Sequence, residues 1–331
     1  MTSTIAIRRR FLAFSLSCMA LAAASPAGAA AAFPDRPIRL VVGFPPGGGA
    51  DFVAREVAIR LGQALNASVV VDNKPGANGV IAASEVARSP ADGYTLLLGV
   101  SASQSISPVL MRKLPYDPMR DFTPISEVGF TPLVLVVNPS LPVKSVADFI
   151  AYVKASPEPV TYGSAGIGNV THMAAELFVQ SSGSSNMRHI PYKGSTQVIT
   201  DLMGGRIGAY FDTLPSSLPF IQNKQLRALA VTGPQRASAA PEIPTMLEAG
   251  VPGYVATTWF GVFAPPALSP ELANRLYEAL RAGFASPEAK QGLTVRGVEP
   301  VLDAPEHFRS ELEADIARWR EVTRKANIVL D

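Results

Sequence analysis

The sequence predicts an α/β protein of two domains, each a mostly parallel sheet flanked by helices, with a ligand cleft between the domains. Three observations lead to this fold class. Short runs rich in Val, Ile and Leu alternate with stretches of helical periodicity, as in parallel strands joined by crossover helices. The 331 residues suffice for two domains of ordinary size. Apolar residues make up 47% of the chain and charged residues 17%, which indicates a large buried core.

Residues 1–32 are predicted to be a signal peptide that lies outside the fold. Arg8–Arg10 precede a short apolar stretch, Phe11–Ala24, and small residues around Ala27–Ala29 form a cleavage zone. The apolar stretch is too short to span a bilayer stably. Arg8 and Arg9 with Phe11 and Leu12 also fit a twin-arginine signal, although Ile7 replaces the usual Ser or Thr. Export with cleavage is therefore expected, and the general secretory and twin-arginine routes both stay open.

The mature chain is expected to lack cysteine and to carry almost no net charge. The only cysteine, Cys18, lies in the predicted signal, so no disulfide, thiol nucleophile or cysteine metal site would remain. Loss of three arginines takes Lys plus Arg from 29 to 26 against 27 acidic residues, a formal charge of −1. Such a chain is not expected to bind nucleic acid or an anionic membrane surface.

The first domain begins with a strand, a helix and a second strand. The run Ile38–Phe44 is apolar throughout, which is typical of a strand buried on both faces. In the helix predicted over Asp51–Leu65, apolar residues four apart form one buried stripe. Further strands are predicted at 68–73 and 94–99, with a helix at 78–88 between them. This repetition predicts a parallel sheet covered on both faces.

A second series of elements begins near residue 133. Strands are predicted at 133–138, 160–164, 188–192, 207–212 and 226–232, and helices at 145–154, 171–180 and 195–203. Ser145 and Asp148 form a capping box at the first of these helices. After a last strand, 258–264, two helices are expected, the first capped by Ser269 and the second by Asp303 with Glu306. We therefore predict one domain at residues 33–130 plus 256–331 and an inserted domain at 131–255.

The glycine-rich loop Gly43–Asp51 (GFPPGGGAD), between the first strand and the first helix, is the strongest candidate site. Three consecutive glycines remove side chains from the loop, so backbone N–H groups can approach a ligand directly. The helix N-terminus that follows adds partial positive charge, and Asp51 is placed to be its N-cap. The pattern predicts an anion pocket, although a tight turn without a ligand would also explain it. It is not a Walker A loop, because no Gly-Lys-Ser/Thr follows.

The loop Tyr162–His172 (YGSAGIGNVTH) is a second candidate. Its glycines resemble a dinucleotide fingerprint only weakly, because Thr171 stands in place of the last glycine and no acidic residue ends a strand at the expected distance. A second anion cradle, with hydroxyls from Ser164 and Thr171 beside a helix N-terminus, fits better. Thr171 is also expected to cap that helix.

Several more polar or glycine-containing segments follow predicted strands. They are Lys74–Gly79, Ser101–Ser103, Tyr192–Ser195 and Asp212–Thr213. Ligands of open α/β sheets bind beyond the carboxyl ends of the strands. Two such sheets facing one another would bring all these loops into one cleft, and this convergence predicts a binding site more strongly than any single motif.

The sequence lacks a recognisable catalytic or metal-binding pattern. It contains three histidines, and none has the spacing of a metal ligand set. Ser164 directly follows a glycine and does not form a nucleophile elbow. A triple of Ser164, His172 and Asp212 could serve a hydrolase, and a nucleotide-dependent oxidoreductase is the other enzyme alternative. We predict neither, and expect no catalytic residues, no cofactor and no metal.

The motifs resemble those of the tripartite tricarboxylate transporter receptors, also called Bug receptors. The matching segments run in order through the mature chain: 33–51, 72–79, 92–97, 162–166, 191–194, 241–245, 248–250 and 259–265. The resemblance implies a periplasmic-binding-protein fold of type II, a periplasmic location and a monomer. It implies a receptor that captures a small carboxylate or related anion and delivers it to the membrane subunits of a transporter. A receptor that feeds a sensor kinase is the alternative.

The resemblance also implies which residues hold the ligand. One ligand carboxylate is expected to bind backbone groups and ordered waters of the glycine loop and of the loops that face it. The expected contacts from the first domain are Phe44, Gly47, Gly48, Ala50, Asp51 and Ser101. Those from the second domain are Ser164, Gly166, Thr171, Tyr192, Gly194 and Asp212. The residues that select the far end of the ligand are not indicated.

Overall fold

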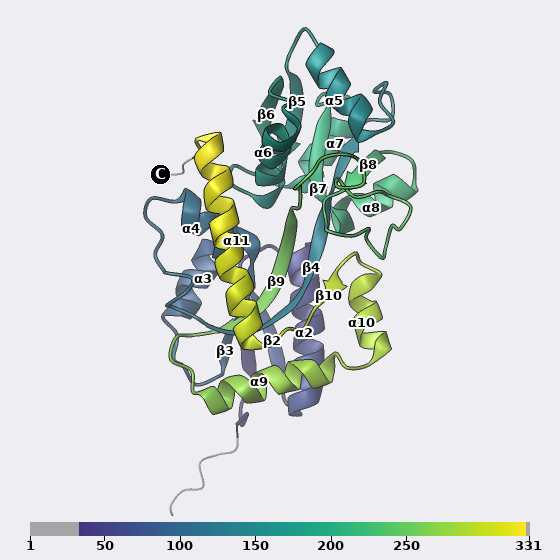
Figure 1. Cartoon of the computed structure of the whole chain (residues 1–331). Helices are drawn as coiled ribbons and strands as arrows, with labels where there is room; N and C mark the ends of the chain where they lie inside the picture. Colours follow the sequence, from purple (N-terminus) through teal and green to yellow (C-terminus); the bar gives the residue numbers. More distant parts are fainter. Residues whose placement is uncertain (1–32, 329–331) are drawn as a thin grey trace, which may run out of the picture. The chain divides into compact units, whose positions relative to one another are not determined.

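The structure, a computed structural model, describes residues 33–328, of which residues 37–328 belong to one compact unit. The predicted signal peptide lies outside the described residues. Between residues 33 and 328, no helix is both long enough and apolar enough to cross a membrane. The ribbon of this unit is shown in Figure 1.

The first sheet is mixed rather than parallel throughout. Its strand order is β2-β1-β3-β9-β4, and a short strand, β10, pairs with β4. The strands are β1 (Ile38–Val42), β2 (Val69–Asn73), β3 (Thr95–Val100), β4 (Thr123–Val137), β9 (Thr257–Ala264) and β10 (Glu299–Pro300). The three strands from the N-terminal part are parallel, as predicted, whereas β9 is antiparallel to both β3 and β4.

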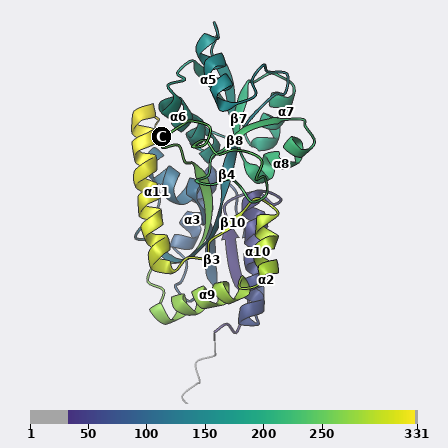
Figure 2. The ribbon, with the colours of Figure 1, turned by 45° about the vertical axis from the view of Figure 1, so that its right-hand side comes forward.

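Helices cover both faces of the first sheet. They are α2 (Gly49–Leu65), α3 (Val80–Ala87), α4 (Ser107–Leu110), α9 (Pro270–Gly283), α10 (Pro287–Thr294) and α11 (Pro305–Ala326), with short helical turns η1 (Ala77–Gly79) and η2 (Ala102–Ile106). Figure 2 shows α11 on one side of β3, β9 and β4, with α2 and α10 on the other side. On the α11 side, Val41, Leu97 and Phe263 pack with Phe308 and Leu312 in one buried cluster.

The second sheet repeats the arrangement. The order is β6-β5-β7-β4, and β8 pairs with the other edge of β4. The added strands are β5 (Val160–Ser164), β6 (Met187–Pro191), β7 (Ala209–Thr213) and β8 (Arg227–Val231). The helices are α5 (Val146–Ala155), α6 (Val170–Ser182), α7 (Ser195–Met203) and α8 (Leu214–Gln222). Strands β5, β6 and β7 are parallel, whereas β4 is antiparallel to both of its neighbours.

The long strand β4 belongs to both sheets. Residues 123–132 pair with β9, and residues 133–137 pair with β7 and β8. Only the second part was predicted, because Pro124, Ser126, Glu127 and Pro132 interrupt the apolar pattern and two register shifts interrupt the ladder. The predicted boundary at 130/131 falls inside this strand. Contacts between residues join both parts into one unit. The division into two domains therefore remains a prediction.

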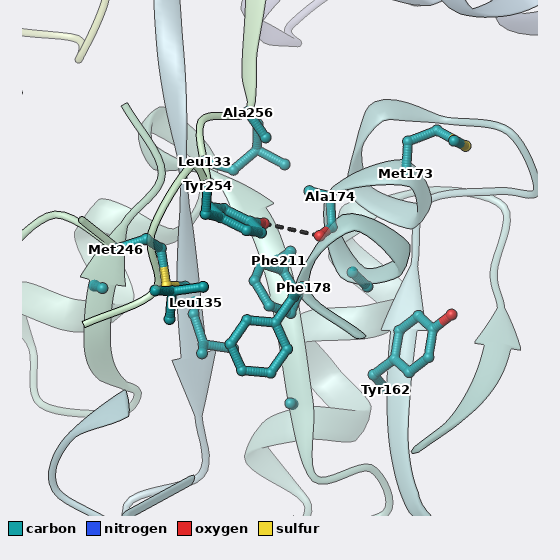
Figure 3. Close-up of a cluster of buried hydrophobic side chains, with 14 of the residues drawn as sticks. Leu133, Leu135, Tyr162, Met173, Ala174, Phe178, Phe211, Met246, Tyr254 and Ala256 are labelled. Atoms are coloured by element: carbon teal, nitrogen blue, oxygen red, sulfur yellow. Dashed lines mark hydrogen bonds between the residues drawn. The ribbon is translucent and has the colours of Figure 1, made fainter. Parts of the chain in front are cut away.

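A buried cluster fills the space between the second sheet and α6 (Figure 3). Phe178 of α6 packs against Phe211 of β7, with ring centroids 5.3 Å apart. Tyr254, in the connection between β8 and β9, packs against both rings. Its hydroxyl donates to the carbonyl of Ala174 at 2.8 Å, which satisfies the buried phenol. This core supports the N-terminus of α6, where the second predicted loop lies.

The predicted caps of α5 and α9 are confirmed, and those of α2 and α11 are wrong. Ser145 accepts from the N–H of Asp148, and Ser269 accepts from the N–H of Leu272. Asp303 does not cap α11, because Pro305 takes the first helical position and Ala304 becomes the N-cap. Asp51 does not cap α2, whose N-cap is Gly48. Another helix, α10, was missed, so three helices rather than two follow β9.

Candidate functional site

Two adjoining cavities lie beside the glycine loop. Most of the predicted loops border a cavity of about 420 Å³, which we call the cleft. A neighbouring cavity of about 530 Å³, the loop cavity, extends over Pro46–Gly48 and shares several lining residues with the cleft, among them Phe44, Gly49 and Ala50. Residues from both sheets line the cleft, including Thr258 of β9 and Thr213 of β7. The convergence of loops predicted from the sequence is therefore present.

Four of the described helices begin at these cavities. The first residues of α2, α6, α7 and α8, or the residues that cap them, line one or both cavities: Gly48, Gly49, Ala50, Asn169, Val170, Thr171, Gly194, Ser195, Thr213 and Pro215. At α2, α7 and α8 no side chain caps the helix. Uncapped N–H groups and the positive ends of helix dipoles both favour an anion. Their convergence favours the binding of an anion at this site.

Asp51 holds the glycine loop in shape from behind. Its carboxylate accepts from the N–H of Gly47 at 2.9 Å, from Arg55 at 2.9 and 3.0 Å, and from Asn73 at 3.0 Å. Burial opposes its ionisation, but these donors outweigh burial and lower the pKa of Asp51. Gly47 has a φ of +86°, a conformation that favours glycine. Asp51 therefore positions the loop and does not line either cavity.

The second loop is held by Thr171 and Ser164. The hydroxyl of Thr171 accepts from the N–H of Ala165 at 2.9 Å, and Thr171 lines the cleft. It does not cap α6, because Asn169 takes that position. Ser164 is buried beneath the loop, where its hydroxyl bonds to Gly166 and to Nε2 of His189 at 2.6 Å. The Ser164 side chain therefore supports the loop from its inner side.

Three other predicted contacts also lie behind the cleft wall. The Tyr192 hydroxyl donates to Asp201 at 2.8 Å. Asp212 is buried and accepts from Ser195 at 3.0 Å and from Ser217 at 2.7 Å. Burial raises the pKa of Asp212, and the hydroxyl donors only partly offset this effect. Buried Ser101 bonds to the hydroxyl of Thr258 at 2.8 Å.

Half of the twelve predicted contacts line the cavities. Those that do are Phe44, Gly47, Gly48, Ala50, Thr171 and Gly194. Those that line neither cavity are Asp51, Ser101, Ser164, Gly166, Tyr192 and Asp212. The role of all twelve in holding a ligand remains a prediction. The first group is placed to touch a ligand, and the second group to position residues that do.

Sequence reasoning did not select Lys193, which lines the cleft and is exposed. Its ammonium group has no ion-pair partner among the described residues. The sequence placed it in a loop that opens a helix, and its neighbours Tyr192 and Gly194 were chosen instead. Asn78 was also missed. Its amide donates across the cleft to the carbonyl of Ile167 at 3.5 Å, and so connects loops of the two sheets.

The side chains of the imagined hydrolase triple are not brought together. Ser164 bonds to His189 rather than to His172, and Asp212 bonds to Ser195 and Ser217. Burial, and then the neighbouring His172, lower the pKa of His189 to about 4. The two imidazoles stack with centroids 3.9 Å apart. The arrangement stiffens the loop from beneath and leaves Ser164 inaccessible to a substrate.

Comparison with known proteins identifies relatives over most of the chain. The model of the tripartite tricarboxylate transporter family receptor matches residues 53–328. Protein BugT of Bordetella pertussis is 38% identical over 299 residues, which cover 90% of this chain and 91% of BugT.

Solved structures give the same result. Rpa4515 of R. palustris with adipate has a TM-score of 0.83 at 39% identity, with 90% of this chain and 99% of that chain covered. MatC of Rhodopseudomonas palustris with bound malate has a TM-score of 0.77 at 27% identity, with 88% and 99% covered. The two-sheet α/β fold is thus shared with periplasmic binding proteins.

Proposed function

The chain belongs to the tripartite tricarboxylate transporter receptor family, a family of solute-binding receptors rather than enzymes, and we propose that it captures a small carboxylate in the cleft. In this proposal one carboxylate group lies at the N-termini of α2 and α7. Backbone N–H groups replace its hydration, and domain closure lowers the local dielectric.

The observation that supports the proposal most strongly is the sign of the charges and helix dipoles around the cavities. Four helix N-termini meet there, Lys193 lines the cleft and Arg296 lines the loop cavity. Among the described residues, no aspartate or glutamate lines either cavity. Every formal charge and every helix end at the site therefore favours an anion.

The walls favour a ligand with a short aliphatic part. Phe44, Val100 and Phe260 give the cleft an apolar side, and hydroxyls of Thr131 and Thr213 lie among them. Adipate in Rpa4515 and malate in MatC, each in a related protein, are such ligands. We extend the proposal to a linear dicarboxylate in this size range.

The proposal includes the cellular role. Receptors of this family are periplasmic, and the sequence predicts an exported chain. The protein would bind its carboxylate outside the inner membrane and pass it to the membrane subunits of a tripartite transporter. Residues 1–32 would direct the export.

A thermal-shift screen of the purified protein tests the ligand class. At least one acid among adipate, malate, aromatic acids and acidic amino acids should raise the Tm. A ligand at 100 times its Kd adds about 2.7 kcal/mol, or roughly 4 °C for a protein of this size. Hexane-1,6-diol and 1,6-diaminohexane serve as neutral and cationic controls. The absence of a shift with every acid would contradict the proposal.

Replacing Lys193 with methionine should weaken the binding of that acid by about fivefold, because an exposed ammonium contributes up to about 1 kcal/mol to an ion pair. Titration calorimetry at low salt would measure the change. The difference from wild type should shrink as salt is added. Lys154→Met, at an exposed position at the end of α5, is the matched control and should bind as wild type does. Equal affinities for both variants would show that Lys193 does not face the ligand.

A further inference from the structure

A third cavity, of about 280 Å³, lies between the long strands and α11. Glu127 and Phe130 of β4, Trp259 of β9 and several side chains of α11 line it. Helix α11 packs against β4, and its ribbon runs alongside the long strands in Figure 1. We call it the α11 cavity.

The α11 cavity and the cleft lie on opposite faces of the same strands. Along β9, Thr258 and Phe260 line the cleft, whereas Thr257 and Trp259 line the α11 cavity. Successive side chains of a strand point to opposite faces of the sheet. The α11 cavity is thus a separate compartment, and none of its lining residues belongs to the cleft.

The charge of the α11 cavity is opposite to that of the cleft. Four carboxyl groups line it, and the formal positive charge comes from Arg318. The carboxyl groups are those of Glu127, Asp303, Glu311 and Asp315. Asp315 already bonds to Trp259 Nε1 at 2.8 Å and pairs with Arg318, and Asp303 pairs with Nδ1 of His307 at 2.6 Å. Two of the acids are therefore satisfied from within the protein.

Glu127 is the acid without a partner. Its side chain lies in the cavity wall, the residue is only 8% exposed, and its carboxyl has no hydrogen-bond donor or cation among the described residues. The carboxyl borders the open space of the cavity, so a group that enters the cavity can reach it. A carboxyl that faces a cavity and has no partner in the protein points to a ligand that arrives from outside the chain.

The surroundings of Glu127 keep it protonated when the cavity is free. Burial, and then the charges of Asp303, Glu311 and Asp315, raise the pKa of Glu127 to about 8. From α11, His307 and Arg318 also line the space, but Arg318 is engaged with Asp315. A cation beside Glu127 would favour its ionised form and displace the proton.

The walls of the cavity suit an organic cation. The rings of Phe130, Trp259 and Phe308 line it, with Trp259 and Phe308 edge to face at 5.4 Å. Aromatic faces attract cations, most strongly where water is excluded. In the described part of the chain, no three His, Cys, Asp or Glu side chains are arranged to hold a metal ion. The chemistry therefore favours a guanidinium or ammonium group over a metal.

We propose that the α11 cavity is a second ligand site, which binds a small guanidinium or ammonium compound through the carboxylate of Glu127 and the aromatic walls. The small volume limits the occupant to a short alkyl chain on the charged group. The site is distinct from the one proposed for the carboxylate in the cleft, because the two cavities share no lining residue.

Titration calorimetry with n-butylguanidinium tests the site, since this probe keeps its charge at every pH used. The wild-type protein should bind one equivalent, and n-butylurea, the neutral isostere, should not bind. Glu127→Gln should weaken binding at least tenfold, as expected for loss of a charge-assisted hydrogen bond. Glu313→Gln, at an exposed residue of α11 outside the cavity, should leave the Kd unchanged. A lack of saturable binding in wild type, or equal binding by Glu127→Gln, overturns the proposal.

Proton release gives a readout that a general structural effect would not produce. At pH 7 the wild-type protein should release close to one proton per butylguanidinium bound, seen as a dependence of the enthalpy on the buffer. Glu127→Gln should release none. If that variant does not fold, Glu311→Gln at the exposed rim should weaken binding several-fold in its place. Binding without proton release in wild type would show that Glu127 is not the partner.

Discussion

Replacing Gly49 with proline should raise the Kd for the bound carboxylate by about 10- to 100-fold and leave the Tm within about 2 °C of wild type. The loss corresponds to one charge-assisted hydrogen bond, roughly 1.5–3 kcal/mol. The effect on Tm should be small, because surface substitutions that the backbone tolerates change the free energy of unfolding only slightly.

Proline is compatible with the fold at this position. Gly49 is the first residue of α2, where proline is favoured because its missing N–H has no partner within the helix. Gly48 before it is extended, with φ −85° and ψ 175°, as a residue before proline requires. A Cβ at Gly49 would meet nothing within 4 Å. The substitution therefore removes a donor from the cleft with little strain.

Gly49→Ala is the matched control, because it adds a Cβ but keeps the N–H. It should bind the carboxylate within about threefold of wild type, since less than 1 kcal/mol is at stake. Calorimetry on the three proteins separates loss of the donor from added bulk. If the alanine and proline variants lose affinity equally, the Gly49 N–H does not hold the anion. If neither loses affinity, the carboxylate binds elsewhere.

The glycine loop and the helix starts could be predicted because their signals are local. Consecutive glycines at the end of an apolar run indicate a turn into a helix, and most of the strands and helices around the cleft follow from periodicity within short windows. Ser145 and Ser269 were recognised by the spacing of a cap to its helix. These signals need no knowledge of distant residues.

The face on which a side chain lies could not be predicted, and this explains the errors at the site. Asp212 was chosen, but its neighbour Thr213 lines the cleft. In the same way Lys193 lines the cleft instead of Tyr192, and Ala165 instead of Ser164. At the end of a strand, successive side chains point to opposite sides, so that one faces the cleft and the next faces the core. The residue predicted from each pair, Asp212, Tyr192 or Ser164, has a hydrogen-bond partner within the protein instead.

The first part of β4 was missed for a different reason. Pro124, Ser126 and Glu127 do not form an apolar or alternating run, and the strand carries register shifts there. It is a strand because β9, more than a hundred residues later, pairs with it. Glu127 is buried as a consequence, so the α11 cavity could not be foreseen from local patterns. Non-local pairing overrides local propensity at this position.

The buried position of Glu127 should make the protein less stable as pH rises from 5 to 8. Its folded pKa of about 8 lies above the value of about 4.5 for a free carboxyl. Between these values the folded state binds more protons than the unfolded state, so stability falls with pH. A single group of this kind changes the free energy of unfolding by up to about 1.4 kcal/mol per pH unit.

Glu127→Gln isolates this contribution, because glutamine has nearly the same shape and does not titrate. The free energy of unfolding of the variant minus that of wild type should grow with pH, by as much as about 4 kcal/mol between pH 5 and pH 8, and level off above pH 8. Other groups with shifted pKa values, including His189 and Asp212, cancel in this difference because they are common to both proteins. Urea denaturation at several pH values would measure it. As a control, the free energy of unfolding of Glu313→Gln, exposed on α11, should change with pH as that of wild type does. If the difference between Glu127→Gln and wild type does not change with pH, Glu127 ionises in the folded protein as freely as in water.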